Sequence, residues 1–287
     1  MGRVLSLPSG HAEDDDIPAE MKSALLKALN AERPVTIGVI GVSGVGKSSL
    51  INRLFRTDFA TSPTIACTKE FTTADVELLA SKGPVAGTPI PLRVVDAPGL
   101  GESRESDPGY LQEYRRNLPE CDAIIWISAA RNRAVALEQE YLSALRSFHS
   151  RIVFGLGQAD LVDPLNWDER INLPSRKQEQ HLEEIRKDRA EKFSTVTGGQ
   201  IAFIPFSAKR SYNLQLVFTA LVKRADRERG WLLSSIKGFQ FDDWMTEEGR
   251  RIMGDVPTRD SAGRQSGRPK IGIRRLLAER TERSGGN

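Results

Sequence analysis

The stretch VTIGVIGVSGVGKSSLINRL occupies residues 35–54 and decides the fold. Residues 35–40 are apolar and rich in β-branched side chains, which predicts a buried parallel strand. Residues 49–54 repeat apolar side chains at helical spacing, so we expect a helix there. The turn between them, residues 41–48, matches the pattern G-x-x-x-x-G-K-[ST] between a strand and a helix. A ligand-free glycine turn is the plain alternative, but this setting favours phosphate binding.

The turn offers several kinds of group to a phosphate. Glycines let successive backbone N–H groups point inward, and the helix that follows adds its N-terminal amides and dipole. Lys47 places a positive charge near the β- and γ-phosphates, and the Ser48 hydroxyl can ligate Mg²⁺. The expected nucleotide-binding residues here are Ser43, Gly44, Val45, Gly46, Lys47, Ser48 and Ser49.

Composition is that of a globular protein. The chain has 287 residues, of which 39% are hydrophobic and 28% charged, and its formal charge is +3. Such a small charge does not by itself indicate a nucleic-acid binder. Cys67 and Cys121 lack metal-site spacing, so a reducing, cytoplasmic setting is the simpler expectation. No apolar run approaches the length of a transmembrane segment, and the N-terminus lacks a signal-peptide core.

The remaining chain alternates strands with helices. We expect further strands at 74–79, 91–95, 123–127, 152–156 and 201–206, and helices at 18–30, 110–118, 137–148, 175–193 and 214–227. This alternation predicts an α/β fold with a mostly parallel six-stranded sheet and helices on both faces. Right-handed crossovers would gather the loops that follow the parallel strands at one edge. The predicted domain spans residues 34–228, between extensions at residues 1–33 and 229–287.

Four later loops follow the phosphate loop in the order of the GTPase motifs: Thr68, Asp96-Ala97-Pro98-Gly99, Gln158-Ala159-Asp160 and Ser207-Ala208-Lys209. In these motifs the chain resembles the translation-factor-like (TRAFAC) class of small GTPases, close to Era-type domains, over roughly residues 34–227. The phrase GVSGVGKSSLIN is also similar to septins and to the Toc chloroplast-import GTPases. Small bacterial Era-like GTPases of unassigned role share this plan. The resemblance implies a three-layer, Ras-like G domain that binds GTP and GDP with Mg²⁺.

The resemblance also assigns roles to single residues. It implies Mg²⁺ ligands at Ser48, Thr68 and Asp96, with Thr68 closing over the ion only when a γ-phosphate is present. The nearby Thr64, Thr72 and Thr73 are alternatives to Thr68. The N–H of Gly99 can meet the γ-phosphate. Lys47, Thr68 and Gly99 are therefore the residues expected to take part in hydrolysis.

The guanine loop departs from the family pattern Asn-Lys-x-Asp, because Gly157 and Gln158 replace its first two residues. Asp160 is retained and can accept the N1–H and N2–H₂ donors of guanine, which adenine lacks. The amide of Gln158 could cover the base, and the N–H of Ala208 can donate to guanine O6. Loss of the Asn contacts affects affinity more than specificity. An ATPase is a further alternative, against which Asp160 and Ser207-Ala208 argue.

The sequence lacks both side chains that GTPases of similar sequence use to assist hydrolysis. Leu100 stands where Ras-type switches carry a water-orienting Gln, and Gly44 stands where potassium-activated relatives carry Asn. We therefore expect slow hydrolysis of GTP that needs a second chain or another partner. Arg104, Arg131 and Arg133 lie in loops that could supply a cation, although solvated surface arginines are the simpler interpretation. The alternative function is a septin-like, GTP-dependent assembly module with negligible turnover.

Two partner classes follow from the sequence. A homodimer across the nucleotide face would complete the hydrolytic site. The chain beyond Gly249 is rich in arginine, glycine and serine, with few acidic residues. A flexible basic tail is the plain interpretation, and binding of RNA or another acidic partner is the alternative.

Overall fold

The computed structural model describes residues 33–61, 70–81, 86–101, 107–225, 230–236 and 246–248. Its main sheet contains β1 (Val35–Gly41), β2 (Thr72–Leu79), β3 (Pro89–Asp96), β4 (Ala123–Ala129), β5 (Ile152–Gly157) and β8 (Phe203–Pro205). The strand order is β2-β3-β1-β4-β5-β8. Strand β2 runs antiparallel to β3, and the other pairs are parallel. The prediction of a mostly parallel six-stranded sheet is confirmed.

The helices alternate with these strands. They are α2 (Lys47–Phe55), α3 (Asp107–Asn117), α4 (Ala136–Ala144), α5 (Arg176–Thr197), α6 (Leu214–Arg224) and α7 (Gly230–Ser235). In the described ranges, 3₁₀ segments occur at Leu118–Glu120 (η1), Arg146–Arg151 (η2) and Ala159–Leu161 (η3). A small antiparallel hairpin joins β6 (Trp167–Asp168) to β7 (Leu173–Pro174) between β5 and α5. The helix expected at 18–30 lies outside the described residues.

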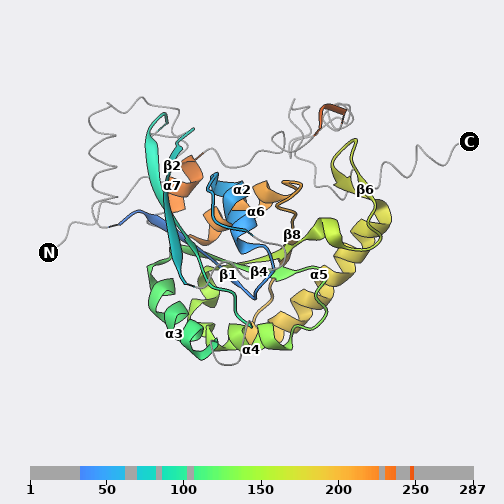
Figure 1. The fold of residues 1–287 in the computed structure, drawn as a ribbon, viewed down its shortest axis with the longest axis horizontal. Helices are drawn as coiled ribbons and strands as arrows, with labels where there is room; N and C mark the ends of the chain where they lie inside the picture. The colour runs from blue at the N-terminus through green and yellow to red at the C-terminus, as the bar shows by residue number, and fades with distance from the viewer. Residues whose placement is uncertain are drawn as a thin grey trace, which may run out of the picture.

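Helices cover both faces of the sheet, as the ribbon in Figure 1 makes visible. One apolar cluster joins the sheet to α3, α4 and α5 through residues such as Tyr114, Leu142 and Phe193. The other joins it to α2, α6 and α7 through residues such as Leu50 and Val217. Strands β1 and β4 are buried along their whole length, as parallel strands between two helical layers must be. The three-layer α/β architecture is thus confirmed.

Most elements differ from their predicted bounds by a few residues, and for two helices the structure shows where the end falls. The helix expected at 137–148 ends at Ala144, because the N–H of Leu145 is shared between the carbonyls of Tyr141 and Leu142 and tightens the chain into η2. Helix α5 begins as expected, with the Ser175 hydroxyl accepting from the N–H of Gln178 at 3.3 Å. It continues to Thr197, beyond the expected residue 193.

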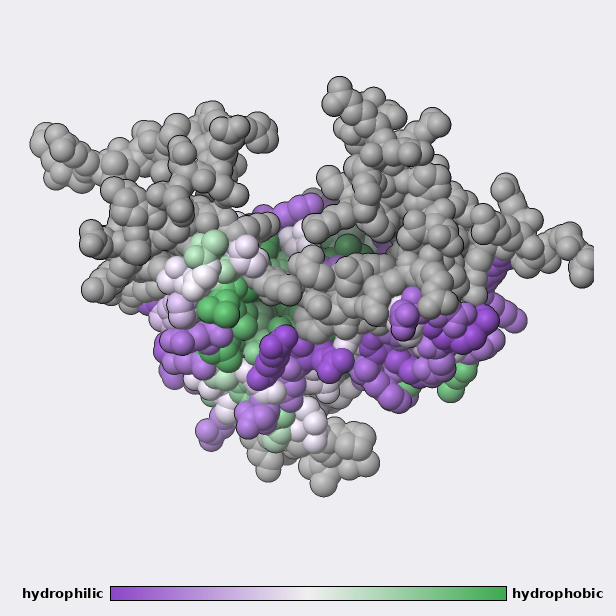
Figure 2. All heavy atoms as spheres, turned by 90° about the horizontal axis from the view of Figure 1, so that it is seen from above, coloured by the Kyte–Doolittle hydropathy of each residue, from purple (hydrophilic) through white to green (hydrophobic). Residues whose placement is uncertain are grey.

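The surface is unevenly polar. Figure 2 shows a predominantly hydrophilic surface on the side where α5 and the β6–β7 hairpin lie in Figure 1. Helix α5 is rich in charged residues along its 22 residues. Within the described part of the chain, no helix combines the length and apolar character that crossing a membrane requires.

Candidate functional site

The phosphate loop lies between β1 and α2, and its glycines have geometric reasons. At Gly41 a Cβ would lie 2.4 Å from the carbonyl oxygen of Ile127, so β1 and β4 can approach here only because no side chain is present. Gly44 and Gly46 have φ angles of 74° and 93°. Gly46 is the N-cap of α2, so the N-terminus of this helix, whose dipole and amides favour an anion, lies at the loop.

Lys47, the first residue of α2, is buried against this loop. Its exposed fraction is 7%, and its Nζ donates to the carbonyls of Gly41 and Val42, both at 3.2 Å. The ammonium group therefore lies over the inner side of the loop rather than in solvent. A lysine held there presents its charge to the space that phosphates would enter.

A hydroxyl and a carboxylate meet beside the lysine. The Ser48 hydroxyl donates to Oδ2 of Asp96 at 2.5 Å, and Asp96 is fully buried at the end of β3. Thr68 and its alternative Thr64 lie outside the described residues. Thr72 and Thr73 belong to β2, where they pair with Asp96 and Val95. The structure thus brings two of the three predicted metal ligands together.

The segment after Asp96 runs along the phosphate loop. Leu100 N donates to Gly41 O at 3.3 Å, and Ser43 N donates to Leu100 O at 2.9 Å. The Leu100 side chain is fully buried in the cluster under α3 and α4. Leu100 is therefore a core residue whose backbone contacts the loop. The next residue, Gly101, donates its N–H to Oδ1 of Asp107 at 3.0 Å.

The expected base-recognition residues follow β5 and β8. Gln158, with a φ of 58°, donates through Nε2 to Gly44 O at 2.9 Å and so connects this loop to the phosphate loop. Oδ1 of Asp160 accepts from the Ser207 hydroxyl at 2.6 Å. Ala208 follows Ser207 in a turn, where its carbonyl accepts from the N–H of Ser211. The amide of Gln158 thus binds protein, whereas the sequence suggested that it could cover the base.

A buried ion pair, which the sequence analysis missed, supports the segment after β4. Arg189 of α5 and Glu138 of α4 are 2% and 1% exposed, with Nη1 and Oε1 3.8 Å apart. Arg189 also donates to the Ser128 hydroxyl and to the Asn132 carbonyl. Burial raises the pKa of Glu138, and Ser128 and the Arg189 charge oppose that rise. Because α5 is rich in charged residues, no signal in the sequence distinguishes Arg189 from its neighbours, and only the structure reveals the pair.

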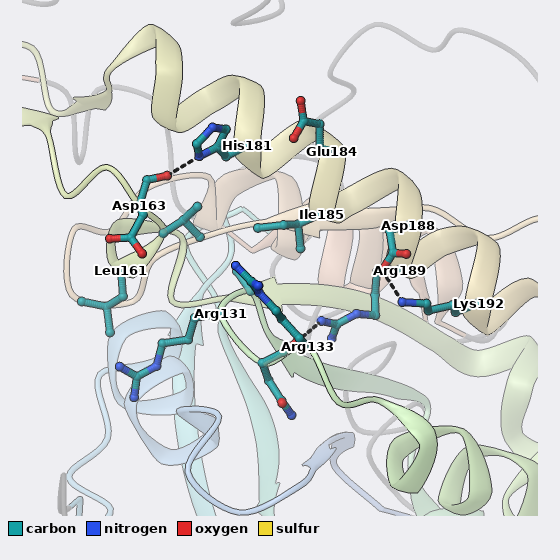
Figure 3. A pocket seen from close by; sticks show the side chains of 13 residues that line it. Arg131, Arg133, Leu161, Asp163, His181, Glu184, Ile185, Asp188, Arg189 and Lys192 are labelled. Atoms are coloured by element: carbon teal, nitrogen blue, oxygen red, sulfur yellow. Dashed lines mark hydrogen bonds and ion pairs between the residues drawn. The ribbon is translucent and has the colours of Figure 1, made fainter.

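A cavity of about 530 Å³, lined in part by Arg189, lies between α5 and the segments after β4 and β5 (Figure 3). Arg131 and Arg133, two of the arginines considered as cation donors, line it and are exposed. The third, Arg104, lies outside the described residues. Ala130 N donates to Gly157 O at 2.9 Å, so the arginine-bearing segment is attached to the base-recognition loop. The cavity therefore lies next to the candidate nucleotide site, and the segment after β4 contributes to both.

Comparison with known proteins gives a family match over part of the chain. Residues 36–156 match the family model described as 50S ribosome-binding GTPase. Two uncharacterized proteins of Escherichia coli strain K12 are similar. YkfA is 33% identical over 155 residues, covering 52% of this chain and 50% of the relative. YfjP is 29% identical over 172 residues, covering 58% and 55%. The chain spans about half the length of these curated relatives.

Among solved structures, an Era variant of Aquifex aeolicus in complex with GDP·AlF4⁻ is similar at 18% identity with a TM-score of 0.47. It covers 76% of this chain and 63% of its own. The family match begins in β1 and runs through β5, so it contains the phosphate loop and the Asp96 segment. The sheet and helices described above have the arrangement that this family match predicts. Over residues 36–156 this chain is accordingly similar to a GTPase family, and its described sheet and helices form a three-layer α/β domain.

Proposed function

We propose that this protein binds GTP and GDP with Mg²⁺, hydrolyses GTP slowly to GDP and phosphate, and acts as a nucleotide-dependent switch. The observation that carries the proposal is the meeting of three groups at one sheet edge. These are the phosphate loop with Lys47, the Ser48–Asp96 pair, and Asp160 with Ser207. Each group suits a different part of a guanine nucleotide.

Phosphate binding uses the backbone amides of Gly44 to Ser49 and the ammonium group of Lys47. The Lys47 ammonium group donates to the carbonyls of Gly41 and Val42, which hold its positive charge at the loop where a phosphate would bind. The Gly99 N–H adds a donor for the γ-phosphate. These contacts are charge-assisted and therefore stronger than neutral hydrogen bonds.

The donor set beside the loop fits Mg²⁺. Ser48 and Asp96 offer a hydroxyl and a carboxylate, the hard oxygen ligands that this ion prefers. The described residues contain no cluster of three or more His, Cys, Asp or Glu side chains that could hold a metal. A sparse protein contribution of this kind is typical of Mg²⁺ held together with phosphates and water. Thr68 is the proposed third ligand, and the ion would neutralise charge on the phosphates.

Guanine recognition rests on Asp160. The Ser207 hydroxyl orients its carboxylate at 2.6 Å, so that both oxygens can accept the paired donors of guanine. The Ala208 N–H is the proposed donor to O6. Adenine presents neither of the donors that Asp160 would accept, and leaving buried polar groups unpaired discriminates strongly against it.

Slow hydrolysis is supported by the burial of Leu100. Its side chain is fully enclosed in the core and could neither reach nor polarise an attacking water. The proposed catalytic contributions come from Lys47, Thr68 and Gly99, through positioning and charge neutralisation. A missing group supplied by a partner would complete the site.

The proposal is tested by measuring GDP and GTP binding together with phosphate release. We expect GDP and GTP to bind in the presence of Mg²⁺ and ATP not to bind. The protein should also release phosphate slowly from bound GTP. Binding without measurable release would favour the alternative, a septin-like assembly module. The buried Leu100 is the observation that keeps this alternative open. Equal binding of ATP and GTP would contradict the guanine assignment itself.

A further inference from the structure

Two glycines on one face of β5 leave the space in which an aromatic ring packs. Gly155 and Gly157 are two residues apart in the strand, so they face the same side. A Cβ at Gly155 would lie 2.8 Å from Cε1 of Phe206, and one at Gly157 would lie 3.1 Å from its Cζ. Phe206 is 1% exposed. The ring therefore occupies the space that side chains on β5 would otherwise need.

Other parts of the site surround the same point. The Cβ position of Gly157 lies 3.2 Å from Cγ2 of Ile127 in β4 and 3.3 Å from the carbonyl oxygen of Val45 in the phosphate loop. Residue 157 is thus the place where β4, β5, the phosphate loop and the Phe206 ring meet. The Cβ of an Asn at 157, as in the family pattern, would lie 3.1 Å from this ring, a contact so tight that the ring would have to move by a few tenths of an ångström.

The backbone of Phe206 holds the base-recognition loop as well. Its N–H donates to Leu156 O at 2.9 Å, and its carbonyl accepts from Ala159 N at 3.0 Å. These contacts bracket Gly157 and Gln158, directly before Asp160. The residue after Phe206 is Ser207, whose hydroxyl donates to Asp160. Phe206 therefore fills the space beside Gly157 with its ring and holds the base-recognition loop with its backbone. It also directly precedes Ser207, the hydrogen-bond partner of the Asp160 carboxylate.

We propose that Phe206 is a positioning residue for base recognition in this chain. Its ring takes the structural place of a side chain at position 157 and holds Asp160 where both carboxylate oxygens can face the base. Phe206 acts through Asp160 and does not touch nucleotide. The inference rests on the proposed binding of guanine nucleotides, and it assigns the base selectivity to a residue outside the recognised motif.

The test compares Phe206→Ala with Phe218→Ala. Phe218 is a buried ring of the same apolar cluster, on α6, so it controls for general loss of packing. The ligands are GDP and inosine diphosphate, which lacks the exocyclic amino group that Asp160 would accept, with inorganic pyrophosphate as a probe of the phosphate loop alone. Melting curves establish that each variant is folded, and Phe206→Leu replaces Phe206→Ala if the latter is not.

The wild type should prefer GDP over inosine diphosphate by about tenfold or more, the value of a hydrogen bond to a charged group. In Phe206→Ala this ratio should fall toward one, with pyrophosphate binding unchanged, and Phe206→Leu should retain part of it. Phe218→Ala should keep the ratio. A ratio unchanged in the folded Phe206 variants, or lowered equally in Phe218→Ala, would overturn the inference alone. A wild type that does not prefer GDP would overturn the proposed guanine binding as well.

Discussion

Lys47 has the most direct link between one side chain and the proposed function. Its Nζ lies 3.2 Å from two loop carbonyls, and its neighbours are backbone atoms of the phosphate loop. Lys47→Ala should leave the fold intact and weaken GDP binding on the order of a hundredfold, because charge-assisted bonds to phosphate are lost. Titration calorimetry with GDP measures this loss.

The matched control is Lys223→Ala, which removes an exposed lysine from α6. It should bind GDP as the wild type does. GDP affinity of Lys47→Ala equal to that of the wild type would show that the lysine does not contact phosphate.

Asp160 should determine which base the protein prefers to bind. Asp160→Asn retains an oxygen for the Ser207 hydroxyl and turns the second oxygen into a donor. This donor opposes the amino group of guanine but suits the carbonyl at the same position of xanthine. We expect GDP binding to weaken by about 2–3 kcal/mol and XDP binding to improve. Competition against labelled GDP measures both.

Asp163→Asn, an exposed change in the same loop, should leave the preference for GDP as it is in the wild type. If Asp160→Asn bound GDP and XDP in the wild-type ratio, the carboxylate would not face the base.

At the scale of elements, the segment after β4 depends on a contact between two helices. Arg189 of α5 pairs with Glu138 of α4 and donates to the carbonyl of Asn132. Arg189→Met leaves Glu138 as an uncompensated buried charge, so it should destabilise the fold by about 3–5 kcal/mol. Urea unfolding monitored by circular dichroism gives the difference.

Lys187→Met, at an exposed position of the same helix, should change stability by less than about 0.5 kcal/mol. The double variant Glu138→Gln with Arg189→Met should recover part of the loss, since the charge is removed with its partner. Arg189→Met as stable as the wild type would mean that the ion pair does not support α5 against α4.

At the scale of the whole molecule, those predicted motifs that the structure describes gather at one edge of the sheet, and this edge carries two exposed arginines, Arg131 and Arg133. Leu100 and Gly44 supply neither a water-orienting amide nor a potassium ligand. We expect hydrolysis to depend on self-association or on another protein, because a cation supplied in trans raises rates by about 10³–10⁵ in GTPases. Specific activity should rise with protein concentration if self-association is the answer.

The control measurement is light scattering with a GTP analogue bound. A monomer with concentration-independent activity would contradict the homodimer. A large gain on replacing sodium with potassium would contradict the reasoning from Gly44. If the specific activity does rise with protein concentration, the hydrolysis rates of Arg131→Ala and Arg133→Ala at high concentration would identify which arginine acts across the interface.

Local pattern was enough to predict the elements that carry the candidate site. The phosphate loop, its strand and its helix lie within 20 consecutive residues, so hydrophobic periodicity and glycine spacing describe them without knowledge of the rest. The alternation of strands and helices likewise predicted the layers. Asp96 and Asp160 could be proposed because each lies at or shortly after the end of a predicted strand, and parallel strands end at one edge.

The sequence by itself determined the α/β class, the order of the motifs and the residue types at the sheet edge, because these depend on neighbours in the chain. Only the tertiary structure decided that Leu100 is buried, that Gln158 binds Gly44, that Phe206 fills the space above Gly155 and Gly157, and that Arg189 pairs with Glu138. Each of these contacts joins segments far apart in sequence. Their pairing follows from strand order and register, which close packing of the whole core selects.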